Sequence, residues 1–493
     1  MSGTRLKQAA LSGARWTVAA RVGLQLFTWP ITIVVMRLLE PHDYGVFAIA
    51  MVVAGCITLF SEFGLGVALV QAEQVGEDSA RIASTVVLAL NALVALTMIL
   101  LAPWAADWFD EPELALIIQV LTLDLVMTAL ATVPQAMLER QLRFRQLSIA
   151  MMAGGASASA ATLAAAWFDL GVWALVAGNL TLGLVRSALL IYFYGRVVWP
   201  SLRFGVVSIA PLLRFGSQVV TTRALWYWYG QADQIILARL LHASLLGFYS
   251  VASQLAMLPA GKAMETFNRV AFPILSRLRT DPVGLKLTHR RLFALVGIYG
   301  FSFCWGLAAV APEFVALVLG DKWTAAATPL MLLALVAPLR MFCSVNNLIA
   351  TAVGAPQAAN KELAFASLLV PLAVLAGAWS GGLDGAALAW LIAYPLVYLL
   401  SNALTCTAIG SRARDGLRPL VAPLAAGLIM LASVWAVRLH LGSAHGLPLL
   451  LAAEIAAGAL TYLVTLQLAS PTLVSDARAL ALELLRPGRT TTP

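Results

Sequence analysis

The stretch RVGLQLFTWPITIVVMRLLEPHDYGVFAIAMVVA, residues 21–54, decides the fold because the chain repeats it. At an offset of 202 residues it aligns without a gap with RALWYWYGQADQIILARLLHASLLGFYSVASQLA, residues 223–256. Eight positions are identical, and they pair Arg21 with Arg223, Ile33 with Ile235, Arg37-Leu38-Leu39 with Arg239-Leu240-Leu241, Gly45 with Gly247, Ala50 with Ala252 and Ala54 with Ala256. Each copy places an Arg inside an apolar helix, followed by a short connection and a second apolar helix. The repeat therefore predicts two homologous membrane halves that each begin with this helical hairpin.

Composition predicts a polytopic membrane protein. Of the 493 residues, 61% are hydrophobic and 11% are charged, and the mean hydropathy is +0.86. A soluble fold of this length carries more charge. Only helices and closed barrels satisfy their backbone groups in a bilayer, and the apolar runs here have the length of membrane helices. The expected fold is therefore all-α.

The apolar runs predict fourteen transmembrane helices. Their boundaries are approximate by a few residues. The predicted spans are residues 16–36, 46–71, 82–104, 113–135, 147–168, 171–194, 211–238, 247–275, 292–319, 328–353, 363–382, 385–409, 419–440 and 447–469. The longest inner connection is expected at residues 276–291.

The distribution of basic residues predicts the orientation. With the N-terminus in the cytoplasm, 22 of the 32 Lys and Arg residues fall in cytoplasmic segments and four fall outside. This asymmetry places both termini in the cytoplasm. A repeat of six spans inserts both halves in the same direction. We expect an N-lobe at residues 1–204, a C-lobe at 205–411, and two further helices with a cytoplasmic tail at 412–493, the two six-helix lobes surrounding a central cavity.

Arginines head a polar stripe in each copy of the repeat. Arg21, Gln25, Thr28 and Thr32 share one helical face, as do Arg223, Tyr227, Gly230 and Gln234. A charge within the bilayer needs a partner or a wet cavity, and the forked guanidinium suits phosphate. The stripes therefore indicate a cationic cavity for an anionic headgroup. The alternative is that each Arg pairs with a carboxylate such as Glu62 or Asp233.

Further charges lie within the predicted spans. Lys262, Glu265 and Arg269 share one face of the eighth span and would suit a cavity wall, although Arg269 could equally snorkel to the headgroups. Arg186 and Arg340 are further candidates, whereas Asp124 has no identified partner. Glu62, Asp233 and Glu265 are candidates either for binding a coupling proton or Na⁺ or for balancing charge.

The sequence gives no sign of an enzyme. It contains no Walker loop, no GxSxG elbow and no HExxH helix, and the five His and four Cys residues lack metal-ligand spacing. We therefore expect no catalytic residues, no metal and no cofactor. The net charge of +8 is explained by orientation in a membrane, so nucleic acid is not an expected partner.

Several short motifs resemble one transporter family. Ser12-Gly13-Ala14-Arg15-Trp16, Ser61-Glu62-Phe63-Gly64-Leu65-Gly66, Leu213-Arg214-Phe215-Gly216 and Leu319-Gly320-Asp321-Lys322-Trp323 are similar to those of Wzx-like polysaccharide flippases of the colanic-acid and xanthan type. These belong to the multidrug/oligosaccharidyl-lipid/polysaccharide (MOP) superfamily, which includes the lipid II flippase and the multidrug and toxin extruders.

The resemblance implies alternating access across the bacterial inner membrane. The implied substrate is an oligosaccharide repeat unit on undecaprenyl pyrophosphate, for exopolysaccharide or lipopolysaccharide biosynthesis. It implies a pyrophosphate site that includes Arg21 and Arg223, and a polysaccharide polymerase and chain-length proteins as partners. Three alternatives stay open, namely a cation-coupled multidrug antiporter, a lipid II flippase, and a membrane polysaccharide polymerase or ligase.

Overall fold

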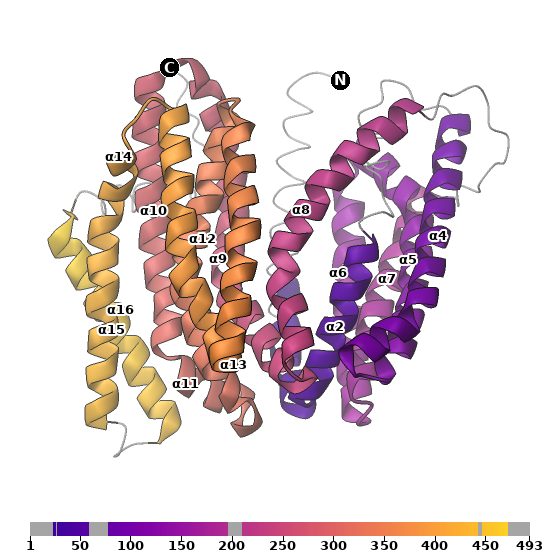
Figure 1. The fold of residues 1–493 in the computed structure, drawn as a ribbon, viewed down its shortest axis with the longest axis horizontal. Coiled ribbons are helices and arrows are strands. Elements are labelled where there is room, and N and C mark those ends of the chain that lie inside the picture. The colour runs from indigo at the N-terminus through magenta and orange to yellow at the C-terminus, as the bar shows by residue number, and fades with distance from the viewer. Residues whose placement is uncertain (1–22, 26, 59–76, 196–209, 442–445, 472–493) are drawn as a thin grey trace. The chain divides into compact units, whose positions relative to one another are not determined.

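The computed structural model describes residues 23–25, 27–58, 77–195, 210–441 and 446–471, without the side chains of 210–222, 266, 269 and 270. Within these ranges every regular element is helical (Figure 1). The predicted all-α, polytopic fold is confirmed. The main helices are α2 (Pro41–Thr58), α4 (Glu77–Phe109), α5 (Glu113–Arg140), α6 (Phe144–Trp167), α7 (Val172–Tyr194), α8 (Ala210–Leu240), α9 (Ala243–Arg277), α10 (Pro282–Ala309), α11 (Ala311–Phe314), α12 (Ala327–Ala352), α13 (Pro356–Ala408), α14 (Ala413–Leu417), α15 (Val421–Leu441) and α16 (Leu447–Ala469).

The described helices follow the predicted spans in order. Eleven of them are long and apolar enough to cross a membrane, judged by length and composition. This number is lower than fourteen for identifiable reasons. Helix α13 contains two predicted spans, α8 carries the polar stripe and is not among the eleven, and the first span is described only as a shorter apolar helix, Gly23–Leu38.

Two glycines turn α13 into a hairpin. Helix α13 is 53 residues long, and its backbone leaves the helical region at Gly381 and at Gly382, where φ is +57°. The turn falls at the predicted boundary between the spans 363–382 and 385–409. An added Cβ at Gly377 would overlap the Gly385 carbonyl oxygen, and one at Gly385 would overlap that of Gly377. The two arms therefore meet backbone to backbone.

The expected inner connection at residues 276–291 is largely helical, and its place between two membrane spans stays a prediction. Helix α9 runs on to Arg277, and α10 begins at Pro282. The Asp281 carboxylate accepts hydrogen bonds from the backbone N–H groups of Val283 and Gly284 at 3.1 and 3.0 Å. Asp at the N-cap and Pro at the first helical position are a strong helix start. Charged residues here extend the helices beyond the apolar spans.

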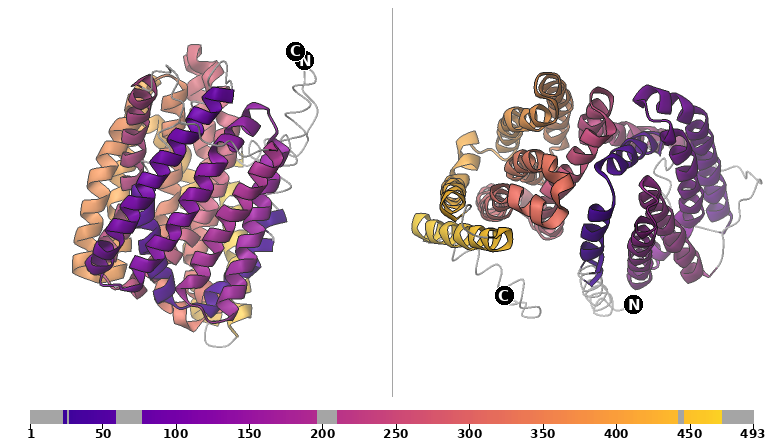
Figure 2. Two further views of the ribbon diagram at one scale, coloured as in Figure 1. Left: turned by 90° about the vertical axis from the view of Figure 1, so that its right-hand side faces the viewer. Right: turned by 90° about the horizontal axis from the view of Figure 1, so that it is seen from below.

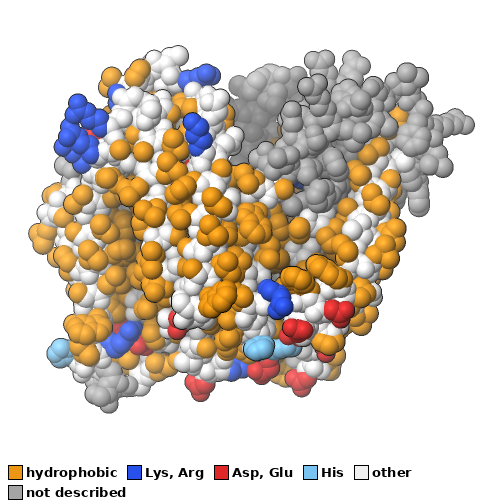
Figure 3. Space-filling view, viewed as in Figure 1, with side chains coloured by type: hydrophobic (Ala, Val, Ile, Leu, Met, Phe, Trp, Pro, Cys, Tyr) orange, Lys and Arg blue, Asp and Glu red, His pale blue; other side chains and the backbone are white. Residues whose placement is uncertain are grey.

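The chain forms two compact units, residues 1–247 and 248–493. In the N-terminal unit α5 packs between α4 and α7, and α2 packs against α8 (Figure 1). The expected lobe boundary at residues 204 and 205 comes from the sequence repeat and stays a prediction. Figure 3 shows hydrophobic side chains over the middle of the visible face and charged side chains toward its two ends.

The last two long helices pack at the edge of the C-terminal unit, where α15 lies beside α10 (Figure 2). Arg438 of α15 connects them to the rest of the unit. Its Nε donates to Glu454 Oε1 on α16 at 3.1 Å, and its Nη2 donates to Glu313 Oε2 on α11 at 2.5 Å. The same nitrogen also donates to the Ala309 carbonyl oxygen at 2.7 Å. One guanidinium therefore binds three helices.

Candidate functional site

Tyr227 of the predicted stripe joins α8 to α2. Its hydroxyl donates a hydrogen bond to the Val52 carbonyl oxygen at 2.5 Å. Its ring lies over Gly55, where an added Cβ would come within 2.5 Å of the hydroxyl oxygen. The glycine permits this approach because it has no side chain. In this conformation the hydroxyl proton of Tyr227 is used by α2.

The rest of the α8 stripe has a different environment. Arg223 and Gln234 are partly exposed, and an added Cβ at Gly230 would meet nothing within 4 Å. Asp233 is 6% exposed, and its Oδ1 accepts the backbone N–H of Gln234 at 2.8 Å. Arg223 and Asp233 both interact with other groups. The stripe is therefore packed at Tyr227 and open at Gly230.

The first copy of the stripe is described only in part, because Arg21 lies outside the described residues, as does Glu62. Gln25 is half-buried. The Thr28 hydroxyl donates to the Gln25 carbonyl oxygen at 3.5 Å, and the Thr32 hydroxyl donates to that of Thr28 at 2.9 Å. These threonines satisfy their hydroxyl groups within their own helix, which lets polar residues sit in an apolar environment.

The charges of the eighth predicted span belong to the other compact unit. Lys262 and Glu265 are exposed on α9, and both interact with other groups. The side chain of Arg269 lies outside the described residues. Helix α9 is held to α10 nearby, because the Tyr299 hydroxyl donates to the Pro259 carbonyl oxygen at 3.1 Å. The predicted substrate-site residues thus divide between the two units, and their assignment to one site stays a prediction.

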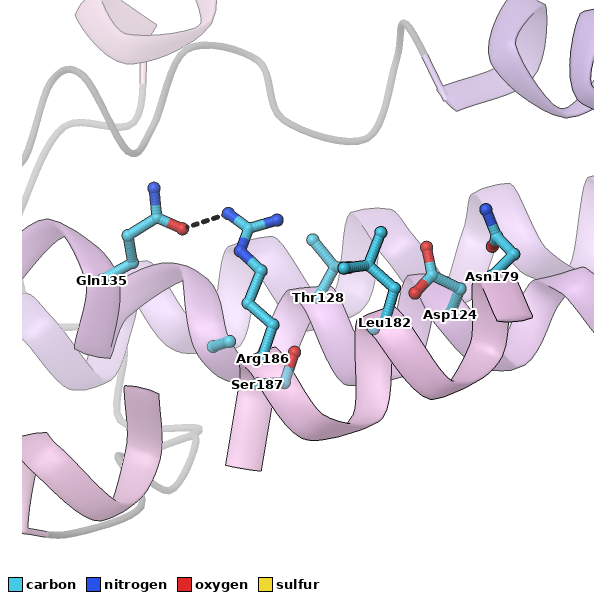
Figure 4. A pocket seen from close by; sticks show the side chains of 9 residues that line it. Asp124, Thr128, Gln135, Asn179, Leu182, Arg186 and Ser187 are labelled. Atoms are coloured by element: carbon cyan, nitrogen blue, oxygen red, sulfur yellow. Dashed lines mark hydrogen bonds between the residues drawn. The ribbon is translucent and has the colours of Figure 1, made fainter. Parts of the chain in front are cut away.

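A polar cavity lies inside the N-terminal unit, between α5 and α7 (Figure 4). Its volume is about 70 Å³, which is room for several water molecules. Arg186 Nη2 donates to Gln135 Oε1 at 2.7 Å, and Gln135 Nε2 donates to Glu139 Oε1 at 2.9 Å. The lining residues are Asp124, Thr128, Ala131, Gln135, Asn179, Leu182, Gly183, Arg186 and Ser187.

Glycines of α6 and α7 bring the charged groups of this cavity together. An added Cβ at Gly183 would overlap the Asp124 carboxylate, and one at Gly154 of α6 would lie 3.3 Å from Arg186 Cβ. The close helix packing places Asp124 and Arg186 on the walls of one cavity, near enough to interact electrostatically. The cavity therefore has room for water between two opposite charges, and Arg186 is oriented through Gln135.

The sequence carries a signal for this cavity that helical spacing alone could have shown. Asp124, Thr128 and Gln135 lie at positions i, i+4 and i+11 of one helix, and Asn179 and Arg186 lie at i and i+7 of another. Each set marks a polar face. Helical spacing does not show that the two faces meet. The sequence therefore assigns no partner to Asp124 and does not single out Gln135.

Fold comparison defines the class of protein. The chain resembles a solved structure described as "Lipid II flippase MurJ, inward closed conformation". The TM-score is 0.73 at 13% sequence identity, covering 93% of this chain and 100% of that one. At this identity the likeness shows the fold alone. The protein is thus a polytopic α-helical membrane protein with the fold of that flippase.

The chain belongs to the family described as "Polysaccharide biosynthesis protein", whose model matches residues 34–328. It is 27% identical over 403 residues to the lipopolysaccharide biosynthesis protein WzxC of Escherichia coli K12, covering 80% of each chain. It is 24% identical over 490 residues to the teichuronic acid biosynthesis protein TuaB of Bacillus subtilis 168, covering 97% of this chain and 98% of that one. The family resemblance predicted from the motifs is confirmed.

Proposed function

We propose that the protein is a flippase for an oligosaccharide repeat unit carried on undecaprenyl pyrophosphate. It moves the unit from the cytoplasmic to the periplasmic leaflet by alternating access, for exopolysaccharide or lipopolysaccharide biosynthesis. Three findings support this proposal. The chain belongs to a polysaccharide biosynthesis family, its relatives WzxC and TuaB are named for the biosynthesis of surface polysaccharides, and its fold is that of a lipid II flippase.

The site assignment rests on the Arg that each copy of the repeat places in a membrane helix. Arg223 is partly exposed on α8, on the same helical face as the open position at Gly230, and Arg21 is its equivalent in the repeat. The planar guanidinium of Arg donates paired hydrogen bonds to the oxygens of a phosphate group. In the proposal these two arginines, with Lys262 or Arg269, hold the pyrophosphate while the lipid tail stays in the bilayer.

We place the protein in the bacterial inner membrane with both termini in the cytoplasm. The support is the concentration of Lys and Arg in the connections assigned to the cytoplasm. A polymerase and chain-length proteins would act after the unit reaches the periplasmic leaflet. A proton or Na⁺ gradient would drive the transport, with Glu62, Asp233 and Glu265 as the candidates chosen from the sequence.

Replacing the paired arginines tests the proposal. Arg21→Ala and Arg223→Ala should each strongly reduce surface polysaccharide in cells that express the variant at the normal level. Arg37→Ala and Arg239→Ala are matched controls, because these arginines are also paired by the repeat but are exposed at the ends of helices. The site is wrong if Arg21→Ala and Arg223→Ala leave surface polysaccharide at the wild-type level.

Three further assays separate the alternatives. Complementation of a lipid II flippase deletion would assign the substrate to the cell wall. Sugar transfer from a lipid-linked donor by the purified protein would make it a polymerase or ligase. Export of cationic drugs that depends on an ion gradient would favour a multidrug antiporter.

A further inference from the structure

Glu362 is a carboxyl group buried in the C-terminal unit, near the start of α13. It is 5% exposed. Within the described part of the chain, it forms no ion pair with a basic side chain. An ionised carboxylate without a partner is very unfavourable in such a place, and the usual outcome is that the group becomes neutral.

The groups around Glu362 are neutral and tightly packed. Ser401 Oγ, from the second arm of α13, donates to Glu362 Oε2 at 2.9 Å, and Asn346 Nδ2 of α12 donates to Ser401 Oγ at 3.1 Å. Ser401 is 1% exposed and Asn346 is not exposed. Cys343 and Asn347 of α12 also adjoin the carboxyl group. Hydroxyl and amide groups stabilise the carboxyl without neutralising its charge.

The same cluster contains buried polar atoms without hydrogen-bond partners. These atoms are Asn346 Oδ1, Tyr398 Oη and His289 Nε2. His289 adjoins Asn346 and belongs to α10, where the next residue, Arg290, pairs with Asp415 at 2.9 Å at the exposed end of the unit. Buried polar atoms without partners are rare in native structures, so those in this cluster need an explanation.

We propose that Glu362 is a proton-binding site that couples the C-terminal unit of the transporter to a proton gradient. The site joins α12 to both arms of α13. A proton needs no space in this packing, whereas a metal ion needs room and several ligands. Loss of the proton would leave a charge where the three segments meet and would favour a conformation in which water enters. The coupling, but not the proton site itself, rests on the proposed flippase function.

The titratable and charged groups near Glu362 come from three other places in the unit. Cys343 of α12 adjoins Glu362, Tyr394 and Tyr398 of the second arm of α13 interact with Cys343, and His289 of α10 adjoins Asn346. Further along, Arg290 and Asp415 face the surface as an ion pair. None of these supplies a buried cation next to the carboxyl group, which leaves the proton to neutralise it.

Infrared difference spectroscopy on the purified full-length protein in lipid nanodiscs tests the site. The wild type at neutral pH should show a protonated-carboxyl band that is lost in Glu362→Gln. Gln has the shape of a protonated Glu and keeps the acceptor for Ser401. Glu139→Gln, which removes a half-buried carboxylate that accepts from Gln135, should keep the band. Equal bands in the wild type and in Glu362→Gln would overturn the proposal.

A second variant covers the case in which Glu362→Gln does not fold. Ser401→Ala removes the hydrogen bond to the carboxyl group, so it should shift the band if Glu362 carries the proton. An unshifted band would contradict the assignment. If the band disappears when Na⁺ is added, the site binds a cation in place of the proton. That result would also contradict the assignment.

Proteoliposomes test the coupling separately. With a lipid-linked oligosaccharide as the probe, collapse of the pH gradient should slow flipping by the wild type and leave Glu362→Gln unaffected. Wild-type flipping that is unchanged without the gradient would overturn the coupling. A protein that shows the Glu362 band but flips no lipid-linked oligosaccharide would instead contradict the proposed function and leave the proton site standing.

Discussion

Gly45 on α2 and Gly247 on α9 occupy equivalent positions in the two copies of the repeat, and each lies against the first residue of the other's helix. An added Cβ at Gly45 would overlap the Ala243 carbonyl oxygen, and one at Gly247 would overlap the Pro41 carbonyl oxygen. Pro41 and Ala243 are themselves separated by 202 residues. The contact is therefore reciprocal, and backbone meets backbone on both sides.

Alanine at either glycine should lower thermal stability by a similar amount. Each added methyl group meets a carbonyl oxygen that cannot rotate away, so the helices must separate, at about 1–3 kcal/mol. The melting temperature in detergent measures this effect. Gly306→Ala in α10 is the control, because its Cβ would meet nothing within 4 Å and Ala favours a helix. Equal melting temperatures for Gly45→Ala and Gly306→Ala would contradict the reciprocal contact.

Arg438→Met should be among the most destabilising single changes in the C-terminal unit. It leaves Glu454, which is not exposed to solvent, next to Glu313 without their shared cation, and breaking such a buried pair costs about 3–5 kcal/mol. Chemical denaturation of the purified protein measures the loss. Adding Glu313→Gln and Glu454→Gln to Arg438→Met should restore much of the stability. Arg291→Ala, at an exposed position, serves as the control and should change little.

Asp124 and Arg186 should show coupled effects in the N-terminal cavity. Each single change, Asp124→Asn or Arg186→Met, leaves one charge without the other, whereas the double variant removes both. We expect the double variant to be less destabilised than the sum of the single variants, with a coupling energy of about 0.5–3 kcal/mol. Unfolding free energies of the four proteins give this number. Strict additivity would mean that the two groups do not interact across the cavity.

Tyr227→Phe should weaken the packing of α8 on α2. It removes the hydrogen bond to Val52 and keeps the ring over Gly55, so the expected loss is about 0.5–1.5 kcal/mol. Tyr192→Phe, at a position 75% exposed, is the matched control. Because this hydrogen bond ties α8 to α2, the variant should also exchange backbone hydrogens of α2 faster. Unchanged exchange in α2 would show that the ring alone holds the helices together.

Much of the fold could be predicted from sequence because membrane helices reveal themselves through local composition. The turn of α13 at Gly381 and Gly382 falls where the apolar run is interrupted, so its position was predicted within a few residues. Apolar composition does not show how far the helices extend past the spans on either side of the connection at 276–291. There Asp281 and Pro282 start a new helix, and the charged residues before and after them continue the helices beyond the apolar spans.

The candidate sites were harder to predict because they depend on which helix faces meet. Helical spacing places Arg223 and Tyr227 on one stripe, yet only the structure shows that the Tyr227 hydroxyl donates a hydrogen bond to α2. Spacing likewise does not reveal that Asp124 and Arg186 share a cavity. Glu362 was overlooked because it stands beside Lys361 near the end of a span, where a carboxylate would ordinarily be solvated. Its burial comes from α12 and the second arm of α13.

The hairpin of α13 also fixes how this part of the chain responds to membrane thickness. Single membrane helices adjust to a thicker or thinner bilayer by tilting independently. The two arms of α13 touch through Gly377 and Gly385 and share one two-residue turn, so neither arm can tilt or slide without the other. We therefore expect the two arms to tilt together, as one body, when the bilayer becomes thicker or thinner.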